Sequence, residues 1–332
     1  MVPSARLCAG LLKPGEGATT VFSPSKLAGG PQAALPILMY HRVLEQPDPL
    51  QAEIHLAKVM DMQFRTLKRF FNVLPLDEAA EMLSQGRLPA RAVCITFDDG
   101  YRDNHDLALP LLKQHGLSAT FYVTSGYLNG GLIFHDVLVE TIRHAPTGAL
   151  DLGIRGVDCL HISDTASRVN AIQRLVGAMK YLPPQERLHL SGRLIEALGN
   201  NAPRSLMMSD EQVRGLSRSG MGIGGHTTHH VILSKLTPET ARDEINTNRD
   251  ALSSLIDKPL TSFAYPNGKP GIDYEASHVQ LVRDAGYRNA VSTHSAVGTR
   301  HASTHELPRF VLNETTSIGV VLRMLRMTAY PI

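Results

Sequence analysis

The sequence predicts an α/β fold in which a mainly parallel sheet forms a closed or nearly closed barrel. Short apolar runs typical of strands alternate with longer stretches of helical spacing, and six or more such units follow one another. Strands separated by helix-length segments are typical of βα units and a parallel sheet. The chain has 332 residues, 43% of them hydrophobic, which suits one large barrel and excludes collagen-like and wholly disordered classes.

The strands are predicted from short runs that are apolar throughout, such as Pro36–Tyr40 and Ala92–Phe97. The others are expected at 72–74, 119–123, 221–225, 262–265, 289–291 and 307–312. The helices are predicted from apolar residues at helical spacing, as within 51–70. Others are expected from 76, with Asp77 as a possible N-cap, at 104–115, 165–180, 184–198, 210–218, 237–257 and 274–285, and from about 315.

Three segments are expected. Residues 1–34 include a stretch rich in Gly, Pro, Ser and Ala and predict a flexible N-terminal arm. Residues 35–332 form the barrel. Residues 130–210 interrupt the alternation of strands and helices with several helical patterns, and we interpret them as a helical insertion packed against the barrel.

The composition also limits partners and location. The formal net charge of +2 is too balanced to indicate nucleic acid or an anionic membrane as a partner. No apolar stretch reaches the roughly 20 residues of a transmembrane helix. Three cysteines without a C-x-x-C spacing argue against a disulfide framework or a thiolate zinc site. We expect a cytoplasmic protein, with export by an atypical signal as the alternative, and the sequence leaves the oligomeric state open.

Two polar motifs follow predicted strands. Asp98 and Asp99 come directly after the strand at 92–97, where adjacent carboxylates are costly unless a cation neutralises them. His226, His229 and His230 follow the strand at 221–225. One helical turn would put the imidazoles of His226 and His230 on the same face, with His226 and His229 as the competing pair. One carboxylate and two imidazoles suit a catalytic divalent metal site with open positions.

These motifs, Thr96-Phe97-Asp98-Asp99-Gly100 and His226-Thr-x-x-His230, resemble the signatures of the polysaccharide deacetylase family, also called the NodB-homology domain or carbohydrate esterase family 4. The similarity extends from residue 36 onward. It implies an irregular (β/α) barrel, with Asp98 as general base and with Asp99, His226 and His230 as metal ligands. The implied metal is Zn2+, with Co2+, Ni2+ or Fe2+ as alternatives, and His229 becomes a supporting or surface residue.

The resemblance also implies two further catalytic groups. His41 ends the first strand and looks like the general acid of circularly permuted, exopolysaccharide-associated members. In the third motif, Phe263 to Gly268, Asn267 stands where the family has a Tyr whose backbone N–H faces the oxyanion. Ala264 stands where many members have an Arg that contacts the catalytic Asp.

The function implied is metal-dependent removal of N-acetyl groups from amino sugars of an oligo- or polysaccharide, in exopolysaccharide or cell-envelope glycan metabolism. An amide needs a polarised carbonyl, an activated water and a proton donor, which the metal, Asp98 and His41 would supply. O-acetyl ester hydrolysis and a catalytically impaired carbohydrate-binding protein are the alternatives. A nicotinamide enzyme is a weaker one, because the glycines of Gly220–Gly225 run through a strand and do not open a helix.

Overall fold

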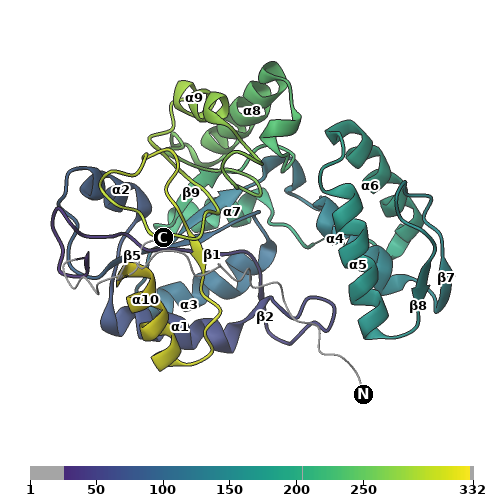
Figure 1. Ribbon diagram of the computed structural model, residues 1–332, viewed down its shortest axis with the longest axis horizontal. Coiled ribbons are helices and arrows are strands. Elements are labelled where there is room, and N and C mark those ends of the chain that lie inside the picture. The colour runs from purple at the N-terminus through teal and green to yellow at the C-terminus, as the bar shows by residue number, and fades with distance from the viewer. Residues whose placement is uncertain (1–25, 204, 330–332) are drawn as a thin grey trace, which may run out of the picture.

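The computed structural model describes residues 26–329 apart from residue 204, and the predicted α/β barrel is confirmed (Figure 1). A curled sheet has the strand order β11-β10-β9-β6-β5-β1-β12, with β4 beside β5, and its pairings are parallel. Its strands are β1 (Ile37–Tyr40), β4 (Asn72–Val73), β5 (Ala92–Phe97), β6 (Thr120–Val123), β9 (Gly222–Gly225), β10 (Ser262–Ala264), β11 (Asn289–Val291) and β12 (Phe310–Val311).

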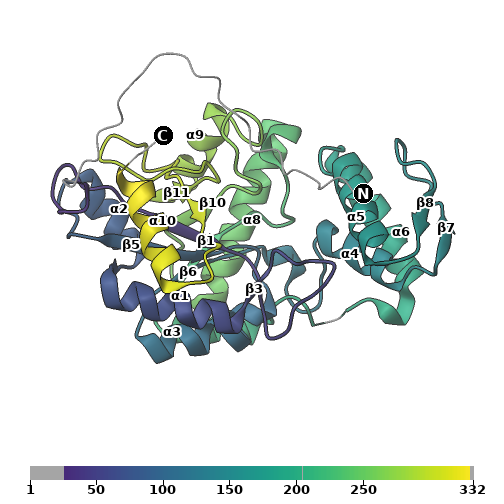
Figure 2. The ribbon, with the colours of Figure 1, turned by 60° about the horizontal axis from the view of Figure 1, so that its bottom comes forward.

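Helices cover the outer face of this sheet (Figures 1 and 2). They are α1 (Ala57–Phe70), α3 (Leu109–His115), α7 (Asp210–Arg218), α8 (Pro238–Ile256), α9 (Ala276–Asp284) and α10 (Ser317–Ala329). Helix α2 (Leu76–Ser84) instead packs its buried side chains against the other face of the sheet. A π-helical turn, Asn104–Ala108, precedes α3, and a small parallel pair, β2 (Val43–Leu44) and β3 (His55–Leu56), precedes α1. Within the described residues, no helix is long and apolar enough to cross a membrane.

The segment before β12 joins the two edges of the sheet. Leu307 forms a parallel bridge with Val291 of β11, and Phe310 of β12 pairs with Leu38 of β1. The N–H of Leu307 donates to Ala290 O at 2.9 Å, and its carbonyl accepts from Ser292 N at 2.9 Å. This short segment therefore brings the last part of the barrel against the first.

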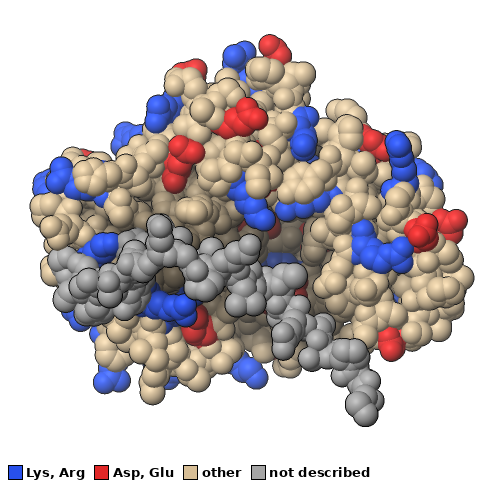
Figure 3. All heavy atoms as spheres, viewed as in Figure 1, with Lys and Arg blue, Asp and Glu red and all other residues tan. Residues whose placement is uncertain are grey.

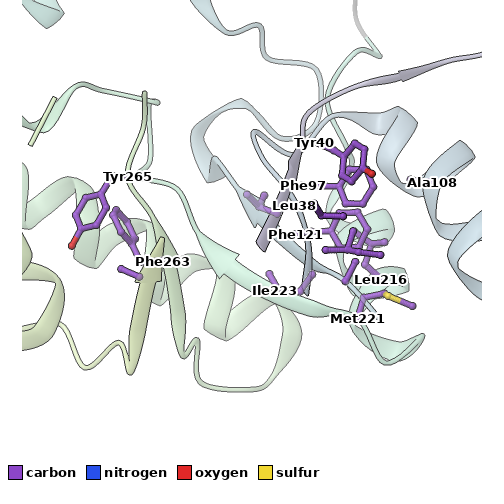
Figure 4. Close-up of a cluster of buried hydrophobic side chains, with 14 of the residues drawn as sticks. Leu38, Tyr40, Phe97, Ala108, Phe121, Leu216, Met221, Ile223, Phe263 and Tyr265 are labelled. Carbon is purple, nitrogen blue, oxygen red and sulfur yellow. The ribbon is translucent and has the colours of Figure 1, made fainter. Parts of the chain in front are cut away.

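Side chains along the strands point alternately to two buried faces of the sheet. Tyr40, Phe97 and Phe121 form a row of stacked rings across β1, β5 and β6, with centroids 5.2 and 4.9 Å apart (Figure 4). They belong to the cluster beneath the helices, whereas Cys94 and Tyr122 belong to a second cluster with Ile37, Ala264 and Val291. Since side chains alternate with period two, Asp98 continues the face of Cys94 and Thr96 and not that of Phe97.

The insertion between β6 and α7 has its own hydrophobic cluster. It contains η3 (Ser125–Tyr127) at its start, α4 (Phe134–His144), α5 (Thr165–Met179), α6 (Pro184–Leu198) and η4 (Gly199–Asn201). It also contains an antiparallel pair that sequence analysis missed, β7 (Gly148–Leu150) and β8 (Leu160–Ile162). Figure 2 shows this part beside the barrel.

Several local expectations are wrong. Residues 51–56 are not helical, because His55 and Leu56 pair with β2 and α1 begins at Ala57. Asp77 does not cap α2, whose N-cap is Pro75. Its Oδ1 instead accepts from Asn289 Nδ2 at 2.6 Å, which ties α2 to β11.

The expected N-terminal arm is also corrected where the structure describes it. Residues 26–34 pack against the barrel: Ala33 and Ala34 are buried, and Gly30 N donates to Leu88 O at 2.8 Å. The rest of that arm lies outside the described residues.

Of the glycines that formally match a dinucleotide-binding motif, Gly220 lies before β9 and the others lie in it, where their lack of a side chain leaves room for large neighbouring side chains. A Cβ on Gly224 would lie 2.4 Å from the Tyr122 ring, and one on Gly225 would lie 2.2 Å from Tyr287 Oη. They serve close packing in the barrel, and the strand is followed directly by the non-helical residues 226–230 and not by a helix.

We predict that Gly224→Ala lowers the free energy of unfolding by about 1–3 kcal/mol, because overpacking a filled core forces side chains and backbone to shift. Gly177→Ala in α5 is the matched control, since a Cβ there meets nothing within 4 Å. Removing a helical glycine should stabilise the protein by up to about 1 kcal/mol. Urea unfolding of both variants measures the difference, and equal effects would contradict the packing argument.

Candidate active site and metal centre

The predicted site residues meet because they follow parallel strands. His41 follows β1, Asp98 and Asp99 follow β5, and His226 follows β9. The carboxyl ends of parallel strands lie at one edge of the sheet, where barrel enzymes place their sites. Asp98 N donates to Tyr40 O at 2.9 Å, which fixes the two strand ends side by side. All six predicted residues line one cavity of about 610 Å3.

Asp98 is held by an arginine that the sequence analysis did not find. Arg309, on the segment that joins β11 to β1, donates from both terminal nitrogens to the two oxygens of Asp98, each at 2.7 Å. Arg309 is 0% exposed and Asp98 only 2%. Further bonds to Ser292 O and Thr96 Oγ1 fix the guanidinium. The arginine missing at Ala264 is thus supplied by the segment directly before β12.

The same contact sets the charge of Asp98. Burial by itself raises the pKa of this carboxyl, but the Arg309 guanidinium opposes it and holds the pKa below its ordinary value. Asp98 is therefore ionised at neutral pH, which a proton-accepting carboxylate requires.

Asp99 faces the two histidines. Its φ of 78° is left-handed and turns its side chain away from that of Asp98. Its Oδ1 lies 3.4 Å from His226 Nε2 and 3.2 Å from His230 Nε2. The three ligand atoms lie within 4.8 Å of one another, so these residues could hold a metal ion.

The donor set fits a divalent cation. Oδ1 of Asp99 is buried and has no hydrogen-bond partner among the described residues. Two donors bound at tetrahedral zinc lie about 3.3 Å apart, given bond lengths near 2.0–2.2 Å. His226 Nδ1 lies 2.7 Å from Ala264 O, to which it donates, so that the Nε2 lone pair is free for a metal. Burial also lowers the pKa of His230 and favours the neutral imidazole that ligation needs.

The two histidines predicted as metal ligands do not share a helical turn, contrary to the expectation. Residues 226–230 form a bent loop with positive φ at Thr227 (60°) and His230 (49°). The loop brings both Nε2 atoms to Asp99, and the rings lie 5.0 Å apart. His229 points elsewhere, with its exposed ring bonded to Glu244 at 2.7 Å. The competing pair, His226 and His229, is therefore wrong.

His41 and Asn267 stand at the cavity as predicted positions, and their roles stay predictions. Asn104 Nδ2 donates to the His41 carbonyl at 2.7 Å, while the His41 side chain is exposed to the cavity. Asn267 has a φ of 59°, and its Nδ2 is buried without a partner among the described residues. Both residues thus present polar atoms to a ligand.

The insertion supplies the second wall of the cavity. Phe134, His135 and Lys180 line it opposite the barrel residues. Tyr101, two residues after Asp99, donates to the buried Asp136 of α4 at 3.1 Å. The surface is hollowed between the barrel and the insertion, with basic side chains at the rim (Figure 3). Sequence analysis missed this wall, although His135 inside an amphipathic helix was visible.

The fold and the site define a class of protein: an α/β barrel with a buried carboxylate beside three residues that could hold a metal ion. The chain belongs to the polysaccharide deacetylase family, whose sequence profile matches residues 85–290. It is therefore an enzyme of the deacetylase class.

Individual proteins agree with this assignment. The putative polysaccharide deacetylase YxkH of Bacillus subtilis is 22% identical over 283 residues, covering 83% of this chain and 71% of that protein. The poly-beta-1,6-N-acetyl-D-glucosamine N-deacetylase of Staphylococcus epidermidis is 30% identical over 114 residues, covering 30% of this chain and 39% of that protein. The structure of Streptococcus pyogenes deacetylase PplD in complex with acetate has the same fold, with a TM-score of 0.60, 19% identity and coverage of 88% and 99%.

Arg309→Met should destabilise the metal-free protein by about 3–5 kcal/mol at neutral pH, because it leaves a buried carboxylate uncompensated. In the wild type the low pKa of Asp98 stabilises the fold above the unfolded pKa, and this contribution is lost as the pH falls through the folded pKa. In the variant, burial raises the pKa, so stability is lost as the pH rises. The deficit should therefore shrink toward acid pH.

Urea unfolding at several pH values measures this deficit. Arg218→Met is the control, because Arg218 pairs with Glu211 on the exposed surface and should change stability little. A deficit that is independent of pH would contradict the role of the ion pair.

His230→Ala and His229→Ala test which of the two adjacent histidines binds the metal. We expect His230→Ala to weaken Zn2+ binding by more than about 100-fold, beyond the loss typical for a supporting hydrogen bond. His229→Ala should weaken it by less than about tenfold, because its ring faces Glu244. Competition with a chromophoric chelator gives both affinities, and equal losses would contradict the assignment of His230.

Proposed function

We propose that this protein removes N-acetyl groups from an N-acetylated amino sugar in an oligo- or polysaccharide, with Zn2+ as its metal and with exopolysaccharide or cell-envelope glycan as the source. The observation that carries the proposal is the arrangement of Asp98, ionised by Arg309, beside the Asp99–His226–His230 group in one cavity. The similarity to an N-deacetylase of a poly-N-acetylglucosamine supports the amide over the ester.

A bound divalent cation would polarise the acetyl carbonyl and acidify the attacking water. Asp98 accepts the proton of that water. Because Arg309 binds both carboxylate oxygens, Asp98 stays ionised and oriented, and each oxygen keeps a further lone pair. The backbone N–H of Asn267 stabilises the oxyanion, as in other acyl-transfer sites.

His41 protonates the departing amine. It stands at the end of β1 beside Asp98, so acid and base approach the substrate from adjacent strand ends. Nitrogen leaves readily only as the neutral amine, so this proton is needed before the carbon–nitrogen bond breaks. The alkoxide of an ester leaves with less assistance from a proton donor than an amine does. Loss of His41 should therefore slow amide hydrolysis more than ester hydrolysis.

A catalytically impaired protein is disfavoured by the same geometry. That alternative rests on Ala264, which stands where many members have an arginine, but Arg309, directly before β12, binds Asp98 instead. The cavity volume of about 610 Å3 lies within the range of ligand-binding clefts and leaves room for a sugar.

The experiment is acetate release from a panel of N- and O-acetylated glycans after chelation and after Zn2+ is restored. The proposal expects acetate together with an equal amount of new primary amine, loss of both on chelation, and recovery with metal. Acetate without amine would establish the esterase alternative. A folded protein that binds Zn2+ and releases no acetate from any glycan would contradict the enzyme proposal.

The roles of His41 and Asp98 predict that replacing either one lowers kcat/KM. Asparagine cannot give a proton to the departing amine, so His41→Asn should lower the rate by about 10²–10⁴-fold. Asp98→Asn should cost a similar factor. Since Arg309 opposes the effect of burial and holds the pKa of Asp98 below its ordinary value, the acid limb of the pH profile should lie below the usual range of an aspartate. Either variant with an unchanged rate and profile would contradict its role.

A further inference from the structure

The loop that carries both metal-ligating imidazoles, His226–His230 (the histidine loop), is held from outside. It has no helical turn of its own, and two of its residues have left-handed backbone conformations. Such conformations persist only where the surroundings determine them. Because buried backbone groups need partners, the source of this loop's hydrogen bonds identifies what shapes it.

Helix α8 accepts the N–H groups of the histidine loop. The Oδ1 of Asn248 accepts from His226 N at 3.0 Å. The Oε2 of Glu244 accepts from Thr228 N and from His229 N, both at 2.9 Å. Glu244 and Asn248 are four residues apart, so they lie on one face of α8.

The segment Thr124–Tyr127 donates to the carbonyl groups of the same loop. Gly126 N donates to Thr228 O at 2.8 Å, and the Tyr127 hydroxyl donates to His229 O at 3.3 Å. The same segment also reaches the third ligand, because Thr124 N donates to Asp99 O at 3.2 Å. The backbone of Asp99 and the histidine loop between His226 and His230 are therefore both bonded to one short segment.

Asn248 connects helix α8 to the segment that follows β6. It is 0% exposed, and its Nδ2 donates to Val123 O at 3.0 Å and to Ser125 Oγ at 2.9 Å. Gly225 makes this approach possible, since a Cβ there would lie 2.8 Å from Asn248 Oδ1. One buried amide thus ties α8, the histidine loop and the segment after β6 together.

We infer that Glu244 and Asn248 are positioning residues for the metal site, which set the spacing of His226 and His230 before the metal binds. The inference rests on the proposed metal-dependent function. Neither residue touches the ligand atoms, and each acts through the backbone of the histidine loop. Residues that orient metal ligands in this way typically contribute 10–100-fold to metal affinity.

The test compares variants of α8 in metal-free protein titrated with Zn2+ against a chromophoric chelator. Glu244→Ala should weaken binding by about 10–100-fold. Glu244→Gln keeps an acceptor for the two loop amides and should restore most of the affinity. Asp243→Asn makes the same chemical change one residue earlier, on an exposed side chain, and should leave affinity unchanged.

A second variant keeps the test decisive if Glu244→Ala does not fold. Asn248→Asp keeps the acceptor for His226 N but faces Val123 O with a carboxylate, which cannot donate, and should weaken Zn2+ binding and alter the visible absorption of the Co2+ form. Asn246→Asp is its control on the same helix. Thermal unfolding of the metal-free proteins confirms that each variant measured is folded.

The outcomes are distinct from those for the proposed function. A folded variant that binds Zn2+ as tightly as the wild type, with the same Co2+ spectrum, overturns the positioning role. A wild-type protein that binds no Zn2+ overturns the proposed metal-dependent function instead. Weaker binding by the α8 variants but not by their controls establishes the inference.

Discussion

The buried ion pair between Asp98 and Arg309 is the interaction on which the site depends. Its two partners come from opposite parts of the chain, 211 residues apart, and both are shielded from solvent. In that environment a lone carboxylate would take up a proton and a lone guanidinium would be very costly. Arg309 lies on the segment that brings β11 to β1, so closure of the barrel and ionisation of the acid require each other.

The shape of the barrel explains why small and large residues are placed as they are. The rings of Tyr122 and Tyr287 occupy the space that side chains on Gly224 and Gly225 would need. The close approach at Gly225 also lets Asn248 reach His226 N. Packing in the barrel and the orientation of a predicted metal ligand thus depend on the same glycine, and the glycine-rich strand is explained without any bound dinucleotide.

Much of this could be predicted from the sequence, for local reasons. Strand positions followed from short apolar runs, and the strand ends carry Asp98, Asp99 and His226 as parallel topology requires. Arg309 was missed because its partner is distant in sequence, although an arginine inside the apolar run 307–312 was a signal. The sequence predicts a helical turn for the histidine loop, because a spacing of four residues does not reveal left-handed backbone conformations. Here the loop takes its shape from hydrogen bonds to side chains of α8, which are distant in sequence.

Two adjacent carboxylates can both be ionised, and so act differently, only if positively charged or proton-donating groups stabilise each of them. Asp98 and Asp99 would otherwise repel each other, and one would take up a proton. The left-handed backbone at Asp99 turns the two side chains apart, so that Asp98 meets a fixed guanidinium while Asp99 meets two imidazoles. A permanent protein cation keeps the first available as a base at any metal concentration. The second lies between two imidazoles, which lower the pKa of its carboxyl against the effect of burial and leave Oδ1 without a hydrogen-bond partner among the described residues. It is therefore ionised and placed to bind a metal ion together with them.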